Sequence, residues 1–283
     1  MIPIKISVIT VCFNAARLLP ATMESVLMQD CTDYEYVIED GESTDDTQTV
    51  VAGYIDRFRE KGINCKYIRK SDEGIYDAMN KAVEAASGEY ICFMNAGDCF
   101  YNTGVLKHIS GIIGGSNDTK PSVIYGDCVV YEHGEFHLFG KKIGRMETAM
   151  PFSHQSAFAR ADILREHPFN TSYRYSADYD FLLTVRDIGG QFTDSGIVVC
   201  ITTADGVSSV NYHDTLMESV LIQKAHGIDR YTPAGLAKKD RELRIKQFVL
   251  DHFPDIIKKQ IRKVQIKKRG QGFEAVIPPW FNI

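Results

Sequence analysis

The stretch Glu89-Tyr90-Ile91-Cys92-Phe93-Met94-Asn95-Ala96-Gly97-Asp98 is the part of the chain from which the fold is best read. It begins as an apolar run of strand length and ends abruptly at Asn95, Gly97 and Asp98. An apolar strand that stops at a small, oxygen-bearing loop is typical of an α/β sheet, which binds ligands at the carboxyl ends of its strands. Asp98 offers a hard oxygen, and Gly97 would let a phosphate or a metal ion approach the backbone. The same residues favour an ordinary turn, so that interpretation stays open here.

Strands and helices alternate along the residues before this stretch. Apolar, β-branched runs predict the strands, and apolar residues at helical spacing predict the helices. Such alternation predicts a mostly parallel central sheet flanked by helices, with the polar strand ends at one edge. No glycine-rich turn follows the first strand, which excludes the usual dinucleotide-binding and Walker sites. The expected strands lie at 5–11, 34–38, 65–69 and 89–94, and the expected helices at 18–29, 47–60 and 75–86.

The end of the second expected strand is rich in carboxylates and hydroxyl groups. Glu39 and Asp40 are followed closely by Ser43, Thr44 and Asp45. One of the last three could cap the helix that follows, because a side-chain oxygen there accepts a hydrogen bond from a free backbone N–H. A cap does not account for Glu39 or Asp40. A carboxylate at this place could accept hydrogen bonds from a nucleobase or a ribose.

Beyond Asp98 the pattern is less regular. Asp178 opens an apolar-periodic helix, and from the residues alone a helix N-cap is the favoured explanation for it. His154 is, by itself, more often structural than catalytic. The remaining expected elements are helices at 105–113, from 178 onwards and at 217–225, strands at 122–127 and 197–202, a strand-like segment at 152–158 and a hairpin around 132–134.

The bulk properties indicate a globular protein that does not bind nucleic acid. The chain has 283 residues, 44% of them hydrophobic and 24% charged, which is enough for a sizeable core. A net charge of −5 argues against a dedicated nucleic-acid binder. No apolar run reaches the length of a membrane span, and the N-terminus lacks the layout of a signal peptide. The seven cysteines are scattered without a CxxC pair, so we expect reduced thiols in a cytoplasmic protein.

The tail from about Lys238 differs in composition from the rest of the chain. Apolar residues interleaved with cations predict a basic amphipathic helix. Such a helix could pack one face on the body of the protein, or it could attach the protein to an anionic membrane surface, so peripheral contact with the inner membrane face stays open. The cations are Lys258, Lys259, Arg262, Lys263, Lys267, Lys268 and Arg269.

Several of these segments, in this order, resemble family 2 glycosyltransferases with the GT-A fold, which is Rossmann-like. The run at 72–81 is close to one found in a subgroup associated with bacterial exopolysaccharide synthesis, the colanic-acid type. The resemblance implies a GT-A domain over 1–225, with a nucleotide-sugar half at 1–100 and an acceptor and catalytic half at 101–225, followed by a basic helical extension over 226–283. The matching segments are SVITVCFN (7–14), EDGESTD (39–45), DEGIYDAMNK (72–81), NAGD (95–98), YGD (125–127), HQ (154–155) and ADY (177–179).

The resemblance also implies a division of labour for a sugar transfer from a UDP- or GDP-sugar to a saccharide or lipid-linked acceptor. Thr10 and Phe13 would line the nucleobase pocket. Asp72 and Asp40, which we prefer over Glu39, would take polar contacts to the base or ribose. The implied site comprises donor-binding Thr10, Phe13, Asn14, Asp40, Asp72, Asn80, Asn95 and Gly97, acceptor- or diphosphate-binding Asp127, His154 and Gln155, Asp98 as the ligand of Mg²⁺ or Mn²⁺, and Asp178 as the general base.

Four positions depart from the family pattern. Asn95 and Gly97 stand where the family often has carboxylates, so Asp98 is the only charged metal ligand and we expect weak metal binding without donor. Gly41 stands where many members have a second aspartate. Ala177 replaces the usual glutamate before the catalytic aspartate.

The predicted reaction is a direct displacement, in which the acceptor hydroxyl loses its proton to Asp178 and the anomeric configuration is inverted. We expect this chemistry to serve the synthesis of a bacterial surface polysaccharide. The reduced metal motif leaves an alternative open, namely a nucleotide-sugar-binding protein that has lost catalysis. A nucleotidyltransferase is less favoured, because its glycine-rich, basic N-terminal loop is missing.

Overall fold

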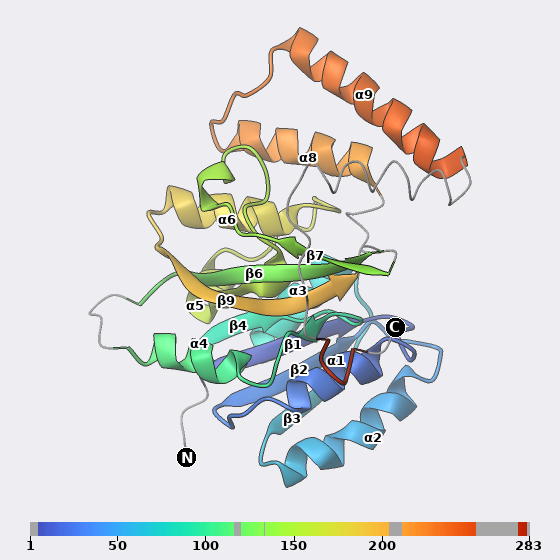
Figure 1. Cartoon of the computed structure of the whole chain (residues 1–283), viewed down its shortest axis with the longest axis vertical. Helices are drawn as coiled ribbons and strands as arrows, with labels where there is room; N and C mark the ends of the chain where they lie inside the picture. The colour runs from blue at the N-terminus through green and yellow to red at the C-terminus, as the bar shows by residue number, and fades with distance from the viewer. Residues whose placement is uncertain (1–4, 116–119, 133, 204–210, 253–276, 282–283) are drawn as a thin grey trace.

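The computed structural model describes residues 5–115, 120–132, 134–203, 211–252 and 277–281. In these residues nine strands form one sheet, with helices on both faces (Figure 1). The strand order is β3-β2-β1-β4-β8-β6-β9-β5, and β7 pairs with β6 outside this path. The strands are β1 (Ile6–Cys12), β2 (Tyr34–Asp40), β3 (Asn64–Arg69), β4 (Tyr90–Phe93), β5 (Cys99–Phe100), β6 (Val123–Glu132), β7 (Glu135–Phe139), β8 (Ala157–Arg160) and β9 (Phe192–Thr203).

Each helix that the apolar periodicity predicts within the described residues is present, and a short helix at Ala161–Glu166 was not predicted. The helices expected at 47–60 and 105–113 have those bounds, and the others agree within a few residues. The helices are α1 (Leu19–Leu27), α2 (Thr47–Glu60), α3 (Ile75–Ala85), α4 (Val105–Ile113), α5 (Ala161–Glu166), α6 (Ala177–Asp187), α8 (Tyr212–Ala225) and α9 (Pro233–His252), with 3₁₀ turns η1 (Ile143–Arg145) and η2 (His154–Ser156).

The first half of the sheet is parallel, as the alternating pattern predicts. β2 and β4 flank β1, and β3 lies outside β2, all in the same direction. Cys12 lies opposite Asp40 in the β1–β2 register, and Asp40 lies opposite Arg69 in the β2–β3 register. The carboxyl ends of these strands therefore reach the same edge, where the loops that follow them lie together.

The second half of the sheet departs from the mostly parallel arrangement that we expected. β8 runs antiparallel to β4 and β6, β7 forms a hairpin with β6, and β5 is antiparallel to β9. Among the strands described here, only β6 and β9 pair in parallel in this half, with register shifts between Tyr125 and Cys128. The hairpin between β6 and β7 is antiparallel because a short connection cannot join parallel neighbours.

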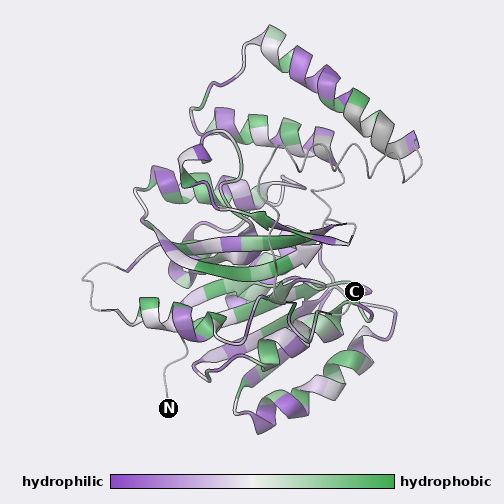
Figure 2. Ribbon diagram, viewed as in Figure 1, coloured by the Kyte–Doolittle hydropathy of each residue, from purple (hydrophilic) through white to green (hydrophobic). Residues whose placement is uncertain are grey.

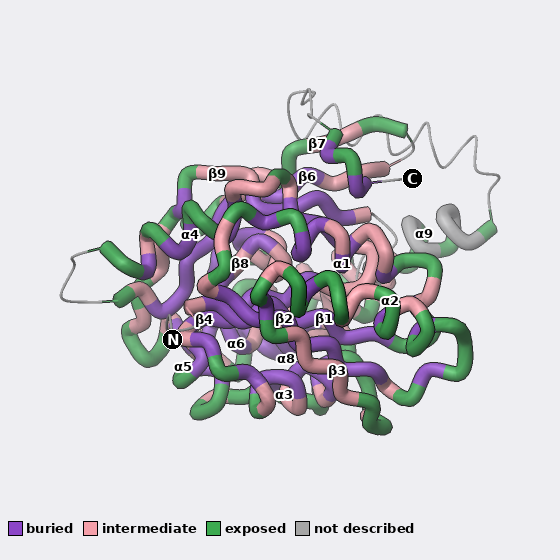
Figure 3. Tube along the Cα trace, turned by 90° about the horizontal axis from the view of Figure 1, so that it is seen from below, coloured by how far each residue is buried: buried purple, intermediate pink, exposed green. Residues whose placement is uncertain are grey.

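Alternate residues of β1 belong to two separate layers of the core. Ile6 and Val8 pack with residues of α1, α2 and α4, whereas Ile9 and Val11 pack with residues of α3, α5 and α6. Figure 2 shows hydrophobic residues along the central strands, and Figure 3 shows that these strands are buried. Because helices cover both faces of the parallel half, its strands read as nearly continuous apolar runs.

The strand expected at 152–158 is wrong in its first part. Residues His154–Ser156 form the turn η2, and β8 begins only at Ala157. The Ser156 hydroxyl fixes this turn, since it donates hydrogen bonds to the carbonyl oxygens of Ser153 and Gly126. The turn takes two polar side chains out of the strand pattern and leaves them at the edge where β4 ends.

Two helix starts also differ from the expectation. The N-cap of α2 is Asp46, although the neighbouring Asp45 carboxylate does accept the backbone N–H of Thr47 at 3.0 Å. The N-cap of α6 is Ser176, so Asp178 lies within the first turn of the helix. The N-cap explanation of Asp178 is therefore wrong.

The C-terminal part of the chain packs on α6 and on the second half of the sheet. α8 packs on α6, and α9 packs on α8 (Figure 1). The indole N–H of Trp280 donates to the carbonyl oxygen of Phe100 at 3.0 Å, and the Phe281 ring packs against Tyr131 and Phe136. The cations of the predicted basic helix lie at 258–269, outside the described residues. No helix within the described ranges is both long and apolar enough to span a membrane.

Candidate active site

The loop after β4 has its shape fixed by contacts with β1 and α1. The backbone N–H of Met94 donates to the carbonyl oxygen of Ile9 at 2.8 Å, and the Thr10 hydroxyl donates to that of Met94 at 2.6 Å. Further along, the backbone N–H of Gly97 donates to the Thr22 hydroxyl at 2.9 Å. Gly97 has a φ of 99°, a conformation that residues with a side chain rarely adopt. The glycine is therefore required by the turn that leads to Asp98.

Asp98 is a buried carboxylate at the end of this loop. Only 8% of the residue is exposed, and the Gln155 amide donates a hydrogen bond of 2.9 Å to its Oδ2 atom. Burial raises the pKa of Asp98 to about 7, although the hydrogen bond from Gln155 and the nearby His154 act in the opposite direction. A charged Asp98 therefore lacks the compensation that a cation would supply.

Four elements meet in a chain of polar contacts beside Asp98. The amide of Asn95 lies 3.3 Å from His154 Nε2, and His154 Nδ1 lies 3.1 Å from Asp178 Oδ2. The hydroxyl of Tyr76, in α3, donates to Asp178 Oδ1 at 3.1 Å. The structure thus brings together Asn95, Asp98, His154, Gln155 and Asp178, which the sequence places in three separate motifs.

The imidazole of His154 and the carboxylate of Asp178 form a polar pair. Burial alone would lower the pKa of His154, but the hydrogen bond and the negative charge of Asp178 outweigh it, so the pKa is raised above its usual value. The carboxylate in turn accepts hydrogen bonds on both of its oxygens. These contacts fix the direction in which Asp178 points.

A small apolar cavity lies beside this pair. It measures about 30 Å³ and is lined by His154, Asp178 and aromatic side chains that include Phe93, Phe152 and Phe169. This volume is enough for about one water molecule, so neither a nucleotide nor a sugar fits. The apolar wall lowers the local dielectric on one side of the pair, which strengthens its hydrogen bond.

Asp98 and Asn95 are the residues that fit a divalent metal ion. Besides the buried carboxylate of Asp98, the Oδ1 atom of Asn95 is buried and has no hydrogen-bond partner. Oxygen atoms of this kind suit Mg²⁺ or Mn²⁺. Nowhere in the described part of the chain do three His, Cys, Asp or Glu side chains gather around a metal position. The remaining ligands would therefore have to come from a bound diphosphate and from water.

Phe13, Gly41 and Asp72 meet at the other side of the same edge. Phe13 is 63% exposed, which is unusual for a phenylalanine. A Cβ atom added to Gly41 would lie 3.6 Å from the Phe13 ring and only 2.3 Å from Asp72 Oδ2. The absence of a side chain at position 41 thus leaves room for the Asp72 carboxylate. A larger residue at position 41 would require the Asp72 carboxylate to move.

Thr10 and Asn14 are used within the protein itself. Thr10 is fully buried, and its hydroxyl bonds to Tyr36 and to the backbone of Met94, so its side chain does not face a ligand. The Oδ1 atom of Asn14 accepts the backbone N–H of Thr44 at 2.8 Å, and so ties the loop after β1 to the loop after β2. In this structure both residues shape the edge of the sheet.

The two carboxylates at the end of β2 have opposite environments. Asp40 is fully buried and accepts hydrogen bonds from the backbone and hydroxyl of Ser43 and from the hydroxyl of Tyr67. Glu39 is 1% exposed, and neither of its oxygens has a hydrogen-bond partner among the described residues. Burial raises the pKa of Glu39 to about 7, with the charge of Lys81 opposing the shift. Contact between Asp40 and a nucleobase would require these internal hydrogen bonds to rearrange.

Asn80 and Asp127 are not part of the network of polar contacts that joins Asn95, His154 and Asp178. The Asn80 amide makes two hydrogen bonds of 2.9 Å with the backbone of Phe169, which clamps that loop to α3. Asp127 accepts the backbone N–H of Lys141 at 2.9 Å and pairs with its ammonium at 3.4 Å. The structure does not join either residue to Asp98 or Asp178.

Tyr76 contacts Asp178 in this network of polar contacts, but the sequence analysis did not predict it as a site residue. The helical pattern places it on the polar side of α3, whereas the structure buries it to 7% exposure. Its partner Asp178 lies 102 positions away in the sequence. One feature of the sequence could have indicated a site role for Tyr76: it lies in the first turn of a helix that starts at the ligand-binding edge.

Relatives of this chain include glycosyltransferases from several bacteria. A "PGL/p-HBAD biosynthesis glycosyltransferase" of Mycobacterium bovis is 34% identical over 178 residues, which cover 62% of this chain and 67% of that protein. An "uncharacterized glycosyltransferase" of Nostoc sp. is 37% identical over 94 residues, covering 33% of this chain and 28% of that protein.

Solved structures share the fold. The TM-score is 0.59 with S. aureus TarS 1-349 in complex with UDP, at 19% identity over 78% of this chain. The match covers 65% of the TarS chain, slightly less than two thirds. The TM-score is 0.60 with the mannosyltransferase PcManGT from Pyrobaculum calidifontis in complex with GDP-Man and Mn²⁺, at 16% identity over 96% of this chain and 77% of that one. The GT-A fold that the sequence predicts is confirmed by these matches.

A family model described as glycosyl transferase family 2 matches residues 7–182. The match begins within β1 and ends within α6, so it includes Asp98, the turn η2 and Asp178. It covers more than half of the chain. The chain belongs to glycosyl transferase family 2.

Proposed function

We propose that this glycosyltransferase moves a sugar, with inversion, from a nucleotide-diphosphate sugar to a hydroxyl of a saccharide or a lipid-linked saccharide. One observation carries the proposal: a carboxylate suited to a metal ion, Asp98, and a carboxylate suited to proton transfer, Asp178, meet at one edge of the sheet through Gln155, His154 and Asn95. Departure of a diphosphate and deprotonation of a hydroxyl are the two tasks that such a transfer requires.

Asp178 is the proposed general base. Tyr76 and His154 hold its two oxygens, so that the carboxylate keeps one orientation when an acceptor hydroxyl arrives. A positioned carboxylate contributes roughly 10²–10⁴-fold to the rate of such a step. Attack by the deprotonated hydroxyl on the face opposite the diphosphate inverts the configuration of the sugar.

Asp98, with Asn95 beside it, would hold Mg²⁺ or Mn²⁺ at the donor diphosphate. When bound, the ion would supply positive charge to the diphosphate as it leaves. The raised pKa of Asp98 supports this role, because a buried carboxylate without a cation is costly to charge. Gln155 keeps the carboxylate in place through the hydrogen bond to Oδ2.

Phe13 and Asp72 are proposed to receive the nucleobase. An exposed ring offers a stacking surface, and a carboxylate at the ring edge accepts an N–H of uracil or guanine. The neighbouring structures support both donor classes, since TarS binds UDP and PcManGT binds GDP-Man. Four residues of the expected donor site are proposed to contribute indirectly, by holding loops in place. They are Thr10, Asn14, Asp40 and Asn80. Asp127, near Lys141, remains a predicted contact to the acceptor.

The proposed setting is bacterial polysaccharide or glycolipid synthesis at the cytoplasmic side of a membrane. The proposal rests on the resemblance to the exopolysaccharide subgroup and on a relative whose name refers to PGL/p-HBAD biosynthesis. Contact with the membrane through the basic segment at 258–269 belongs to the same proposal.

A second candidate is a nucleotide-sugar-binding protein without catalysis. It is favoured by the single charged ligand in the loop after β4, where Asn95 and Gly97 replace carboxylates. Both candidate functions predict that the protein binds the donor, but only the glycosyltransferase predicts turnover.

The experiment is a donor screen followed by a transfer assay. Thermal unfolding is measured with UDP-glucose, UDP-GlcNAc and GDP-mannose, each with and without Mn²⁺, because a donor at 100 times its Kd stabilises the fold by about 2.7 kcal/mol. The best donor is then incubated with alkyl glycosides, and the anomeric configuration of the product is read by NMR. Stabilisation without transfer or hydrolysis would favour the binding protein. A retained configuration would contradict the proposed displacement.

A further inference from the structure

We infer that Glu218, in α8, is a positioning residue for Asp178. The inference rests on the proposed function, in which Asp178 is the general base. α8 spans Tyr212–Ala225 and so lies beyond the segment 7–182 that matches the family model. The geometry of a family site thus depends on a helix that the family match does not include.

The carboxylate of Glu218 holds the loop that leads into α6. Its Oε1 atom accepts the backbone N–H of Arg174 at 2.6 Å, and its Oε2 atom accepts the backbone N–H of Tyr175 at 2.7 Å. Two short, charge-assisted hydrogen bonds to consecutive amides fix both the position and the direction of this backbone. Asp178 follows three residues after Tyr175, within the first turn of α6.

Two further contacts join α8 to the start of α6. The Ser176 hydroxyl, at the N-cap, lies 3.5 Å from the carbonyl oxygen of Thr215. The amide of Gln223 donates to the hydroxyl of Tyr179 at 3.0 Å, and that hydroxyl donates to the carbonyl oxygen of Met146 at 2.6 Å. The residues on both sides of Asp178 are therefore attached to α8.

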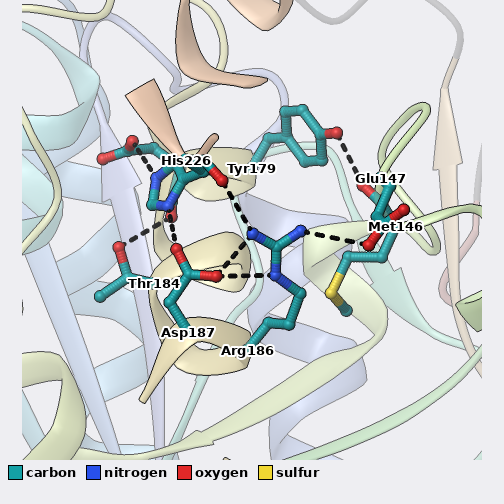
Figure 4. A network of polar contacts seen from close by, with 8 residues as sticks. Met146, Glu147, Tyr179, Thr184, Arg186, Asp187 and His226 are labelled. Atoms are coloured by element: carbon teal, nitrogen blue, oxygen red, sulfur yellow. Dashed lines mark hydrogen bonds and ion pairs between the residues drawn. The ribbon is translucent and has the colours of Figure 1, made fainter. Parts of the chain in front are cut away.

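The far end of α6 is attached as well. Figure 4 shows the network in which His226, just after α8, pairs with Asp187, while Arg186 contacts Asp187 and Glu147. His226 also pairs at 3.0 Å with Asp180, in the first turn of α6, and so joins both ends of the helix. These contacts fix α6 as a whole, whereas Glu218 acts on the loop next to the carboxylate. This distinction lets the role of Glu218 be tested separately.

A small displacement of Asp178 is expected to affect proton transfer more than donor binding. A general base acts only within hydrogen-bond reach of the proton that it takes, and a misplacement of about 1 Å can cost about 10²-fold in rate. The donor-side residues Phe13, Asp72 and Asp98 lie on other loops. Loss of the Glu218 clamp should therefore lower kcat and leave donor binding intact.

The test compares Glu218→Gln with Asp214→Asn. Both substitutions change a carboxylate to an amide on α8, but the side chain of Asp214 contacts His213 and not the loop before α6. The reaction followed is release of nucleotide from the sugar nucleotide that stabilises the fold most, with water in place of the acceptor. For Glu218→Gln we expect a kcat about tenfold lower with an unchanged donor KM, and for Asp214→Asn no change.

Amide hydrogen exchange gives a readout that does not depend on activity. The amides of Arg174 and Tyr175 should exchange about tenfold faster in Glu218→Gln than in the parent protein, at an unchanged global Tm. Glu218→Asp keeps the charge but is shorter, so it should recover part of both effects. If Glu218→Gln does not fold, Glu218→Asp is used for the exchange measurement in its place. Unchanged exchange at these two amides in both Glu218 variants would overturn the inference.

A double variant separates this inference from the proposed function. If Glu218 acts through Asp178, the variant carrying both Asp178→Asn and Glu218→Gln should lose no more activity than Asp178→Asn alone. Additive losses would show that Glu218 acts elsewhere. Full activity of Asp178→Asn would remove the base assignment, while the exchange data would still decide whether Glu218 holds the loop.

Discussion

Residues 5–100 and residues 123–225 bring side chains to the site in different ways. In the first region β1, β2 and β4 are parallel, and each polar loop follows its strand directly. In the second region His154 lies in a 3₁₀ turn, and Asp178 lies in a helix whose start is held by Glu218 of α8. The first arrangement depends on local strand geometry, and the second depends on contacts between segments that are distant in sequence.

Because of this difference, we expect substitutions in the two regions to affect donor binding and turnover separately. The proposed donor residues Phe13, Asp72 and Asp98 belong to the first region, and the proposed base belongs to the second. Substitutions in the first region should change donor or metal affinity, whereas those in the second should change kcat. Four predictions test that separation, in order of decreasing effect.

The largest effect is expected for Asp178→Asn. An amide does not accept the acceptor proton, so transfer should fall by about 10²–10⁴-fold. Donor binding, measured by thermal shift with Mn²⁺, should stay within about twofold, because the proposed base would touch the acceptor and not the donor. Asp162→Asn, which removes an exposed partner of Arg160, is the surface control and should be fully active. Retained turnover in Asp178→Asn would contradict the assignment of Asp178 as the general base.

The next effect is expected for Asp98→Ala. Removal of the only charged residue proposed as a metal ligand in the loop should abolish the extra stabilisation expected from Mn²⁺ in the presence of donor, and should lower turnover by about 10²-fold. The measurement is a Mn²⁺ titration of Tm and of rate at fixed donor concentration. Glu89→Gln, which removes a surface partner of Lys120, is the control. An unchanged Mn²⁺ response would place the metal elsewhere.

A smaller effect is expected for Phe13→Ala. Loss of an exposed stacking surface should weaken donor binding by about tenfold and change stability by less than about 0.5 kcal/mol. Phe58→Ala is the contrast, because Phe58 is fully buried against Tyr36 and its loss should cost about 3–5 kcal/mol. Donor titrations and urea unfolding measure the two quantities. Equal donor affinity in Phe13→Ala would exclude a stacking role.

The smallest effect is expected for Glu39→Gln and depends on pH. The folded-state pKa of Glu39 is raised to about 7 from 4.5, so the folded protein binds a proton that the unfolded chain releases between these values. The wild type should therefore lose stability as pH rises from about 4.5 to 7. The substitution should raise stability at pH 8 by about 1 kcal/mol, or about 2–4 °C in Tm, and much less at pH 5. An equal change in Tm at both pH values would contradict the assignment.

Much of the parallel half could be predicted from the sequence. The buried strands β1 and β4 are continuous apolar runs, and the apolar spacing in α2 and α4 gave their bounds. Parallel strands end at one edge, so Asp98 and Asp72 could be assigned to a common ligand-binding region without any knowledge of contacts.

The second half could not be predicted to the same degree. The segment at 152–158 was expected to be strand-like, but hydrogen bonds of Ser156 to Ser153 and Gly126 bend its first part into a turn. Tyr76 reads as a polar-face residue because its partner Asp178 comes from another element. The internal use of Thr10 and Asp40 was also hidden, since hydroxyl and carboxylate groups look the same in sequence whether a ligand or the protein itself takes their hydrogen bonds.

The sequence by itself determined the order of strands and helices over residues 5–100, the parallel edge and the types of side chain that gather there. These depend on apolar periodicity and on local turn chemistry, which act over a few residues. The tertiary structure alone decided that His154 faces Asp178, that Gly41 leaves room for Asp72, and that α8 holds the loop before α6. Contacts of this kind join residues tens of positions apart, and packing of the whole chain selects among the many pairings that the sequence would permit.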